Sequence, residues 1–166
     1  MARLTNQRVA DAWVSGVRAT SGNLYTDGET IWSYGRTLPI AKHLADGRVL
    51  YNISHYSHTT DVHQSHVRGS IAWRGLEVIE CRHIDKDRNA QDTRLALRIR
   101  IGKIPKCRKL DDRIADVKQE LLRYMKYNEA LGYKNEAWVN AIVFAMSNLK
   151  GKALRKWAST EKVTLL

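Results

Sequence analysis

Two Asp-Gly dipeptides, Asp27-Gly28 and Asp46-Gly47, constrain the fold of this chain more than any other feature of its sequence. Each lies between runs of residues that favour strands, such as Thr30 to Tyr34. Because glycine readily adopts the positive φ that a tight hairpin turn requires, an Asp-Gly pair in this setting predicts two antiparallel strands. The segment between the two dipeptides, residues 39–44, fits either a strand or one helical turn. Residues 1–58 are therefore predicted to form an antiparallel β-meander.

Two later segments extend the predicted antiparallel sheet to about five strands. Residues 76–84 have the composition of a strand. Residues 94–101 alternate strictly, with leucine and isoleucine on one side and mostly arginine on the other. The polar segment 85–92 suits a hairpin loop between them. Short helices are predicted over residues 3–14 and 61–68, the second capped by Thr59 or Thr60.

The C-terminal third predicts two helices. The first begins at Asp111 or Asp112 as N-cap and ends near Leu131, before Gly132. The second is capped by Asn135 and continues past Gly151. Packed as a hairpin on one sheet face, these helices complete an α+β fold in a single domain, residues 1–166. Its predicted parts are the meander (1–58), a short helix plus a basic β-hairpin (59–110) and the two helices (111–158).

The composition predicts a basic cytoplasmic protein. The net charge is +11 and the isoelectric point is about 9.9, a balance that favours nucleic acid, an anionic membrane surface or an acidic protein as partner. Cys81 and Cys107 lack a CxxC spacing, and the N-terminus lacks the apolar core of a signal peptide. The longest apolar stretch is too short to cross a membrane. We therefore expect reduced thiols, and no membrane partner.

Residues 20–68 carry a recognisable series of short motifs. They are Gly22-Asn23-Leu24-Tyr25, Asp27-Gly28, Trp32-Ser33-Tyr34-Gly35, Ile40-Ala41, Asn52, Tyr56-Ser57-His58-Thr59-Thr60 and His63. This series resembles a family of small, uncharacterised proteins encoded by bacteriophages and other mobile elements, with the skeleton SYG…N…YS-x-TT-x-x-H. The resemblance implies a phage or mobile-element origin and no particular chemistry. It covers about fifty residues of the chain.

The segment from Asn52 to His66 concentrates histidine, serine and threonine, and is the candidate catalytic or metal-binding region. The candidate residues are His55, His58, His63, His66, Tyr56 and Ser57. Together with Asp61 these histidines offer enough ligands for zinc or manganese, although their spacing matches no zinc signature. A histidine there could instead act as a general base beside Ser57 or Tyr56. The alternative is that the hydroxyl residues cap turns and a helix, and the histidines are partly exposed.

Two basic runs are the candidate nucleic-acid contacts. The first comprises Arg94, Arg98, Arg100, Lys103, Lys106, Arg108 and Lys109, and the second Lys150, Lys152, Arg155 and Lys156, beside Trp157. On a strand, Arg98 and Arg100 would project from one face about 7 Å apart, close to the spacing of successive phosphates. Arginine also binds phosphate through a planar fork. The alternative is a solvated face that binds nothing.

Three functions follow from these observations. The first is a phage-encoded accessory protein that binds DNA or RNA through the basic residues. The second is an inhibitor of a host factor or defence system, acting in the host cytoplasm by protein–protein binding. The third is a small nuclease or hydrolase built on the histidine cluster. With no Walker loop, dinucleotide motif or paired-carboxylate cluster, we expect no cofactor and no metal, and we favour a non-enzymatic role.

Overall fold

Both Asp-Gly dipeptides turn the chain between antiparallel strands in the computed structural model, which describes residues 4–160. Gly28 and Gly47 have φ angles of 98° and 86°, as the hairpin prediction requires. A Cβ on Gly28 would lie 2.5 Å from the carbonyl oxygen of Gly16, so this turn also needs glycine for space. The predicted hairpins are confirmed.

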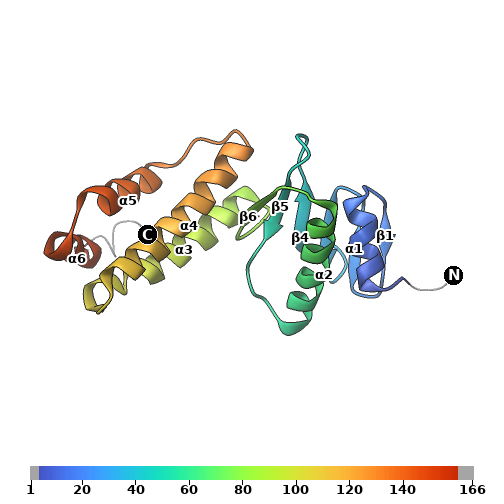
Figure 1. Cartoon of the computed structure of the whole chain (residues 1–166), viewed down its shortest axis with the longest axis horizontal. Helices are drawn as coiled ribbons and strands as arrows, with labels where there is room; N and C mark the ends of the chain where they lie inside the picture. The colour runs from blue at the N-terminus through green and yellow to red at the C-terminus, as the bar shows by residue number, and fades with distance from the viewer. Residues whose placement is uncertain (1–3, 161–166) are drawn as a thin grey trace. The chain divides into compact units, whose positions relative to one another are not determined.

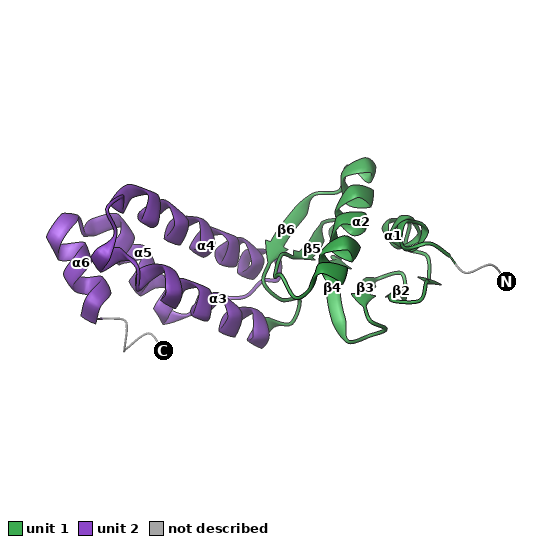
Figure 2. Ribbon diagram, turned by 90° about the horizontal axis from the view of Figure 1, so that it is seen from below, with its two compact units in different colours: residues 1–86 green, residues 87–166 purple. Residues whose placement is uncertain are grey.

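The chain divides into two compact units, residues 1–86 and 87–166 (Figure 2). The first unit contains the sheet and two helices, and the second is helical. Each unit has a hydrophobic core of its own, and the two cores share no residue. The fold is α+β, as predicted, with strands and most helices segregated along the chain.

The sheet of the first unit has six strands in sequential order. They are β1 (Ala19–Thr20), β2 (Leu24–Thr26), β3 (Thr30–Ser33), β4 (Leu38–His43), β5 (Val49–Asn52) and β6 (Val78–Cys81). The first five pair antiparallel, whereas β5 and β6 pair parallel, so the prediction of a wholly antiparallel sheet was wrong. A parallel pair needs a crossover connection, and helix α2 (His58–Arg74) provides it.

Helices α1 (Asn6–Val14) and α2 lie side by side on one face of the sheet (Figure 1). Trp13 and Val67 from the two helices join Leu24, Ile31 and other strand residues in one core. Helix α2 is longer than the predicted 61–68, because Ser57 caps it earlier and Gly69 is accommodated inside it. It ends at Gly75, which has a φ of 69°.

The prediction of a strand over residues 94–101, and of a hairpin loop before it, was wrong. Both segments belong to helix α3 (Lys86–Ile101). The buried positions of α3 are Asn89, Thr93, Ala96, Leu97 and Ile101, a stripe with helical spacing. Two of these residues are polar, so the stripe was hidden in the sequence. Leucine, alanine and arginine also have high helix propensity.

The second unit continues with η1 (Ile104–Lys106), α4 (Leu110–Ala130), α5 (Ala137–Asn148) and α6 (Gly151–Thr160). The predicted helices near 111–131 and 135–157 exist, although the second is interrupted at Leu149. Lys109 and Glu136 occupy the N-cap positions, not the predicted Asp111, Asp112 or Asn135.

The C-terminal helices pack against α3 and η1 in the core of the second unit. The sheet face that we expected them to cover is instead packed by α1 and α2. The pattern of apolar residues identified these helices correctly. It could not identify the surface on which they pack, because an apolar stripe fits any apolar partner.

Several smaller expectations concern exposure. Trp73 was expected to be the most exposed tryptophan and is 80% exposed, whereas Trp13 and Trp138 are buried. Cys81 and Cys107 are both free. Among residues 4–160, no helix has the length and apolar character needed to span a membrane.

Candidate functional site

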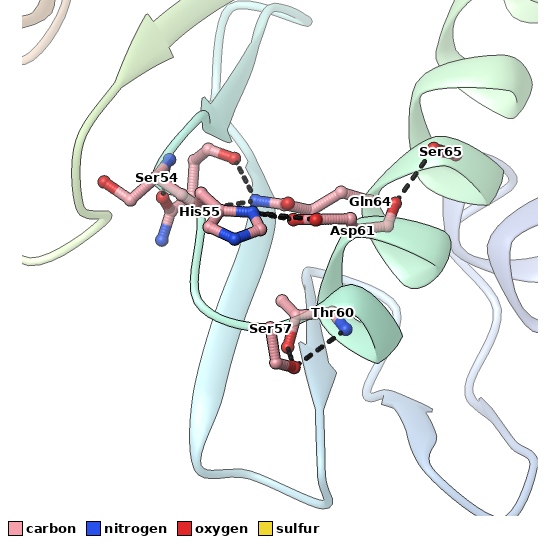
Figure 3. A network of polar contacts seen from close by, with 8 residues as sticks. Ser54, His55, Ser57, Thr60, Asp61, Gln64 and Ser65 are labelled. Atoms are coloured by element: carbon pink, nitrogen blue, oxygen red, sulfur yellow. Dashed lines mark hydrogen bonds and ion pairs between the residues drawn. The ribbon is translucent and has the colours of Figure 1, made fainter.

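One hydroxyl residue of the histidine-rich segment, Ser57, is the N-cap of helix α2. The Ser57 hydroxyl accepts from the backbone N–H of Thr60 at 3.3 Å and lies 3.1 Å from the Thr60 hydroxyl (Figure 3). Asp61 lies in the first turn, where a carboxylate interacts favourably with the helix dipole. These contacts agree with the structural alternative for the serines and threonines.

The loop between β5 and α2 is held by side chains from both of its ends. Gln64 on α2 donates from Nε2 to the carbonyl oxygens of Asn52 and Ser54, at 2.8 and 3.1 Å (Figure 3). The backbone N–H of Ser54 donates to Asn52 Oδ1, and the hydroxyl of Ser54 donates to the carbonyl of Arg82. The loop is therefore tied to α2 and to the segment after β6.

Each of the four histidines in this segment has a different environment. His55 pairs with Asp61, with Nδ1 2.7 Å from Oδ2, at a site where 75% of the histidine side chain is exposed (Figure 3). His66 donates from Nδ1 to Gln7 Oε1 of α1 at 2.9 Å. His58 is exposed, whereas His63 is buried. Among residues 4–160, no three His, Cys, Asp or Glu side chains gather where they could hold a metal ion.

His63 makes the most specific contact of the four. Its Nδ1 lies 2.7 Å from the hydroxyl of Ser33, at the end of β3, and both side chains are fully buried. The ring of Tyr34 packs edge-on against His63. Burial lowers the pKa of His63, and the nearby His66 lowers it further. A hydroxyl beside an imidazole is the pairing used by nucleophilic enzymes, but substrate has no access to this one. The pair anchors α2 to the sheet.

Several residues of the motif series in residues 20–68 are brought together by this packing. Ser33 contacts His63, and Asn52 donates from Nδ2 to the Tyr56 hydroxyl at 3.1 Å. Asn52 also donates to the carbonyl of Pro39. The roles of Ser33 and Asn52 were not assigned from sequence. Their positions within the motif series were the only signal in the sequence that could have pointed to them.

Two arginines proposed as phosphate contacts, Arg94 and Arg100, have partners within the second unit. Arg94 lies over the ring of Trp138, with Cζ 5.4 Å from the centroid. Arg100 pairs with the buried carboxylate of Glu120 at 3.3 Å, as does Arg123 at 3.1 Å.

The expected spacing of Arg98 and Arg100 on a strand was wrong. On helix α3, residues two positions apart point about 200° apart around the axis. These two side chains therefore do not share a face, although Arg98 itself is exposed.

Arg155 on α6 joins the two basic runs of the sequence. Its Nη1 donates to the carbonyl oxygens of Ile104, Pro105 and Cys107, each at 3.0 Å. Helix α6 packs against η1 through these bonds and through apolar contacts, with Ile104 and Leu154 fully buried in the same core. Residues about fifty positions apart thus become neighbours.

This packing places two sets of exposed basic residues on adjacent elements, and we call them together the basic end. It comprises Lys103, Lys106, Arg108 and Lys109 around η1, and Lys150, Lys152 and Lys156 on and beside α6; all seven are exposed. Asp111 and Asp112 in the first turn of α4 lie next to it and offset part of its charge. Residues 87–166 contain 18 Lys and Arg against 9 Asp and Glu, so the second unit carries +9 of the net +11.

Comparison with known proteins finds no matching family model, no matching curated protein and no matching solved structure. The functional assignment therefore depends on the chain's own residues and geometry.

Proposed function

We propose that this protein is a nucleic-acid-binding accessory protein, which binds phosphates through the basic end. The observation that carries the proposal is the contact of Arg155 with the carbonyls of η1, because it joins two separate basic runs into one surface. Exposed lysine and arginine side chains release counterions when they bind phosphates, which gives affinity without sequence preference. The resemblance of residues 20–68 to a phage family supports an origin in a phage or mobile element, with action in the host cytoplasm.

The test is a fluorescence-anisotropy titration of labelled DNA and RNA at several salt concentrations. Replacing Lys106 and Lys152 by glutamine removes two phosphate contacts from the basic end. We expect weaker binding to every sequence, and a salt dependence of log K whose slope falls by about 2.

The matched control is the double variant Lys126→Gln and Lys134→Gln. It removes the same charge from exposed positions of the same unit, and Lys126 lies about 24 Å along α4 from the basic end. Equal losses of affinity in the two double variants would refute a localised binding surface, because net charge alone would then explain binding.

A protein partner is the second candidate function, and an apolar groove between α4 and α5 favours it. The groove has a volume of about 320 Å³ and is lined by Leu121, Leu122, Met125, Val143 and Met146, among others. Phe144, on the same helix α5, is 64% exposed. Apolar surfaces of this kind occur at protein interfaces. Retention of a host protein after nuclease treatment would favour this function. The one histidine that contacts a serine hydroxyl, His63, is buried together with it, so this pair gives no support to the hydrolase hypothesis.

A further inference from the structure

The first unit carries an aromatic pair on the sheet face opposite its helices. On β2, Leu24 and Thr26 are buried while Tyr25 between them is half-buried. On β3, Ile31 and Ser33 are buried while Trp32 between them is half-buried. Because side chains alternate along a strand, Tyr25 and Trp32 project away from the face that α1 and α2 cover. They are direct partners in the β2–β3 register, with ring centroids 5.5 Å apart.

Two arginines lie over this pair. The Cζ of Arg36, which is exposed, lies 5.0 Å from the centroid of Tyr25 and 5.9 Å from that of Trp32. Its Nη2 donates to the Tyr25 hydroxyl at 2.7 Å. The Cζ of Arg18 lies 5.9 Å from the centroid of the Tyr25 ring. We call Tyr25, Trp32, Arg18 and Arg36 the aromatic face.

The composition of the aromatic face fits one class of ligand. Aromatic rings and guanidinium planes are the surfaces on which unpaired bases stack, and arginine also binds the phosphates beside them. A protein core does not need this pair, since neither Tyr25 nor Trp32 belongs to the apolar cluster of the unit. A duplex offers no free base faces, because its bases are stacked on one another. The combination of rings and cations therefore selects a single strand.

We propose that the aromatic face binds unpaired bases of a single-stranded nucleic acid, with Arg18 and Arg36 contacting the adjacent phosphates. This inference deepens the proposed function, on which it rests, by naming the substrate class. The basic end supplies contacts to any phosphate backbone, and the aromatic face distinguishes single strands from duplexes.

The experiment compares Trp32→Ala with Trp73→Ala in the full-length protein. Trp73 is a matched control, because it is the same residue type, is 80% exposed and lies on α2, which packs on the other sheet face. The probes are a labelled oligo(dT) of about 12 nucleotides and a duplex of about 12 base pairs. We expect Trp32→Ala to bind oligo(dT) roughly 5- to 150-fold more weakly, with duplex affinity unchanged. Trp73→Ala should match the wild-type protein on both probes.

A second pair of variants keeps the test decisive if Trp32→Ala does not fold. Arg36→Glu changes an exposed residue of the aromatic face, and Arg74→Glu makes the same change on α2. Arg36→Glu should lower the affinity for oligo(dT) more than Arg74→Glu does. Circular dichroism and thermal unfolding establish that each variant is folded.

The outcomes separate the inference from the proposed function. If the changes at Trp32 and Arg36 match their controls while the basic-end variant loses affinity for both probes, the inference is overturned and the proposed function stands. If the Trp32 change lowers only oligo(dT) binding while the basic-end variant matches its control, the inference stands and the basic end is overturned as the phosphate-binding surface of the proposed function. A wild-type protein that binds neither probe refutes both.

Discussion

His63 lies buried between the sheet and helix α2. Its side chain is 1% exposed, and the Ser33 hydroxyl lies 2.7 Å from Nδ1. Burial disfavours the charged imidazolium and so lowers the pKa of His63 from its ordinary value of 6.5. In the unfolded chain the same histidine is fully solvated and binds a proton more readily.

The stability of the protein should therefore fall in mild acid through His63. Because the folded-state pKa lies below the unfolded value, the unfolded state binds more protons as the pH falls through 6.5. The contribution of His63 to the free energy of unfolding is fully present above pH 6.5 and is lost as the pH falls toward the folded-state pKa. The slope of this loss is up to about 1.4 kcal/mol per pH unit. Urea unfolding at pH values from about 7.5 to about 5, on either side of the ordinary histidine pKa, measures this loss of stability.

The comparison needed is between His63→Gln and His58→Gln. The first variant should reduce the loss of stability on acidification, whereas the second, at an exposed histidine, should keep the wild-type pH dependence. Identical pH profiles for His63→Gln and the wild-type protein would show that another group controls acid stability.

Helix α6 and the turn η1 form one structural element through Arg155. The guanidinium donates to three carbonyl oxygens of the chain between α3 and α4. The adjacent Lys156 carries the same charge but is exposed. Arg155 is therefore a structural residue of the basic end, and Lys156 is one of its exposed cations.

Replacing each of these residues by methionine separates structure from charge. Arg155→Met should lower the free energy of unfolding by about 1–3 kcal/mol, because it removes the guanidinium that donates to these three carbonyls. It should also weaken nucleic-acid binding more than Lys156→Met, since the two basic runs lose their connection. Urea unfolding and anisotropy titration on the two variants measure these effects. Equal effects on stability would contradict the structural role of Arg155.

At the scale of the whole molecule, residues 4–160 build two cores from different parts of the chain. Val67 and Leu24 belong to the core of residues 1–86, and Leu97 and Leu154 to that of residues 87–166. Cooperative unfolding follows shared buried contacts, so separate cores favour separate unfolding units. The proposed binding surfaces are divided in the same way, with the aromatic face on the first unit and the basic end on the second.

Core truncations in the two units should therefore act locally. Leu97→Ala should destabilise the second unit by about 2–5 kcal/mol and raise hydrogen exchange within residues 87–160, leaving the strand amides of the first unit protected. Val67→Ala should give the reciprocal pattern. Hydrogen exchange followed by mass spectrometry distinguishes the two. Increased exchange throughout the chain in both variants would instead show one cooperative domain.

Features that depend on neighbouring residues were predictable from the sequence. The Asp-Gly turns, helix α1 and the two longest C-terminal helical segments follow from local propensity and apolar spacing, which act over a few residues. The α+β class followed from these elements. The strand assigned to residues 94–101 failed because an eight-residue alternation also fits part of a helix, and the polar residues Asn89 and Thr93 concealed the helical stripe.

Contacts between distant segments were decided only by the tertiary structure. The amino-acid sequence by itself determined the charge, the hairpins and the residues available for binding. It did not determine that His63 faces Ser33, that Arg100 faces Glu120, or that α6 lies on η1. These pairings depend on which apolar faces bury one another, and a bond to a backbone carbonyl, such as that of Arg155, has no signature in residue type.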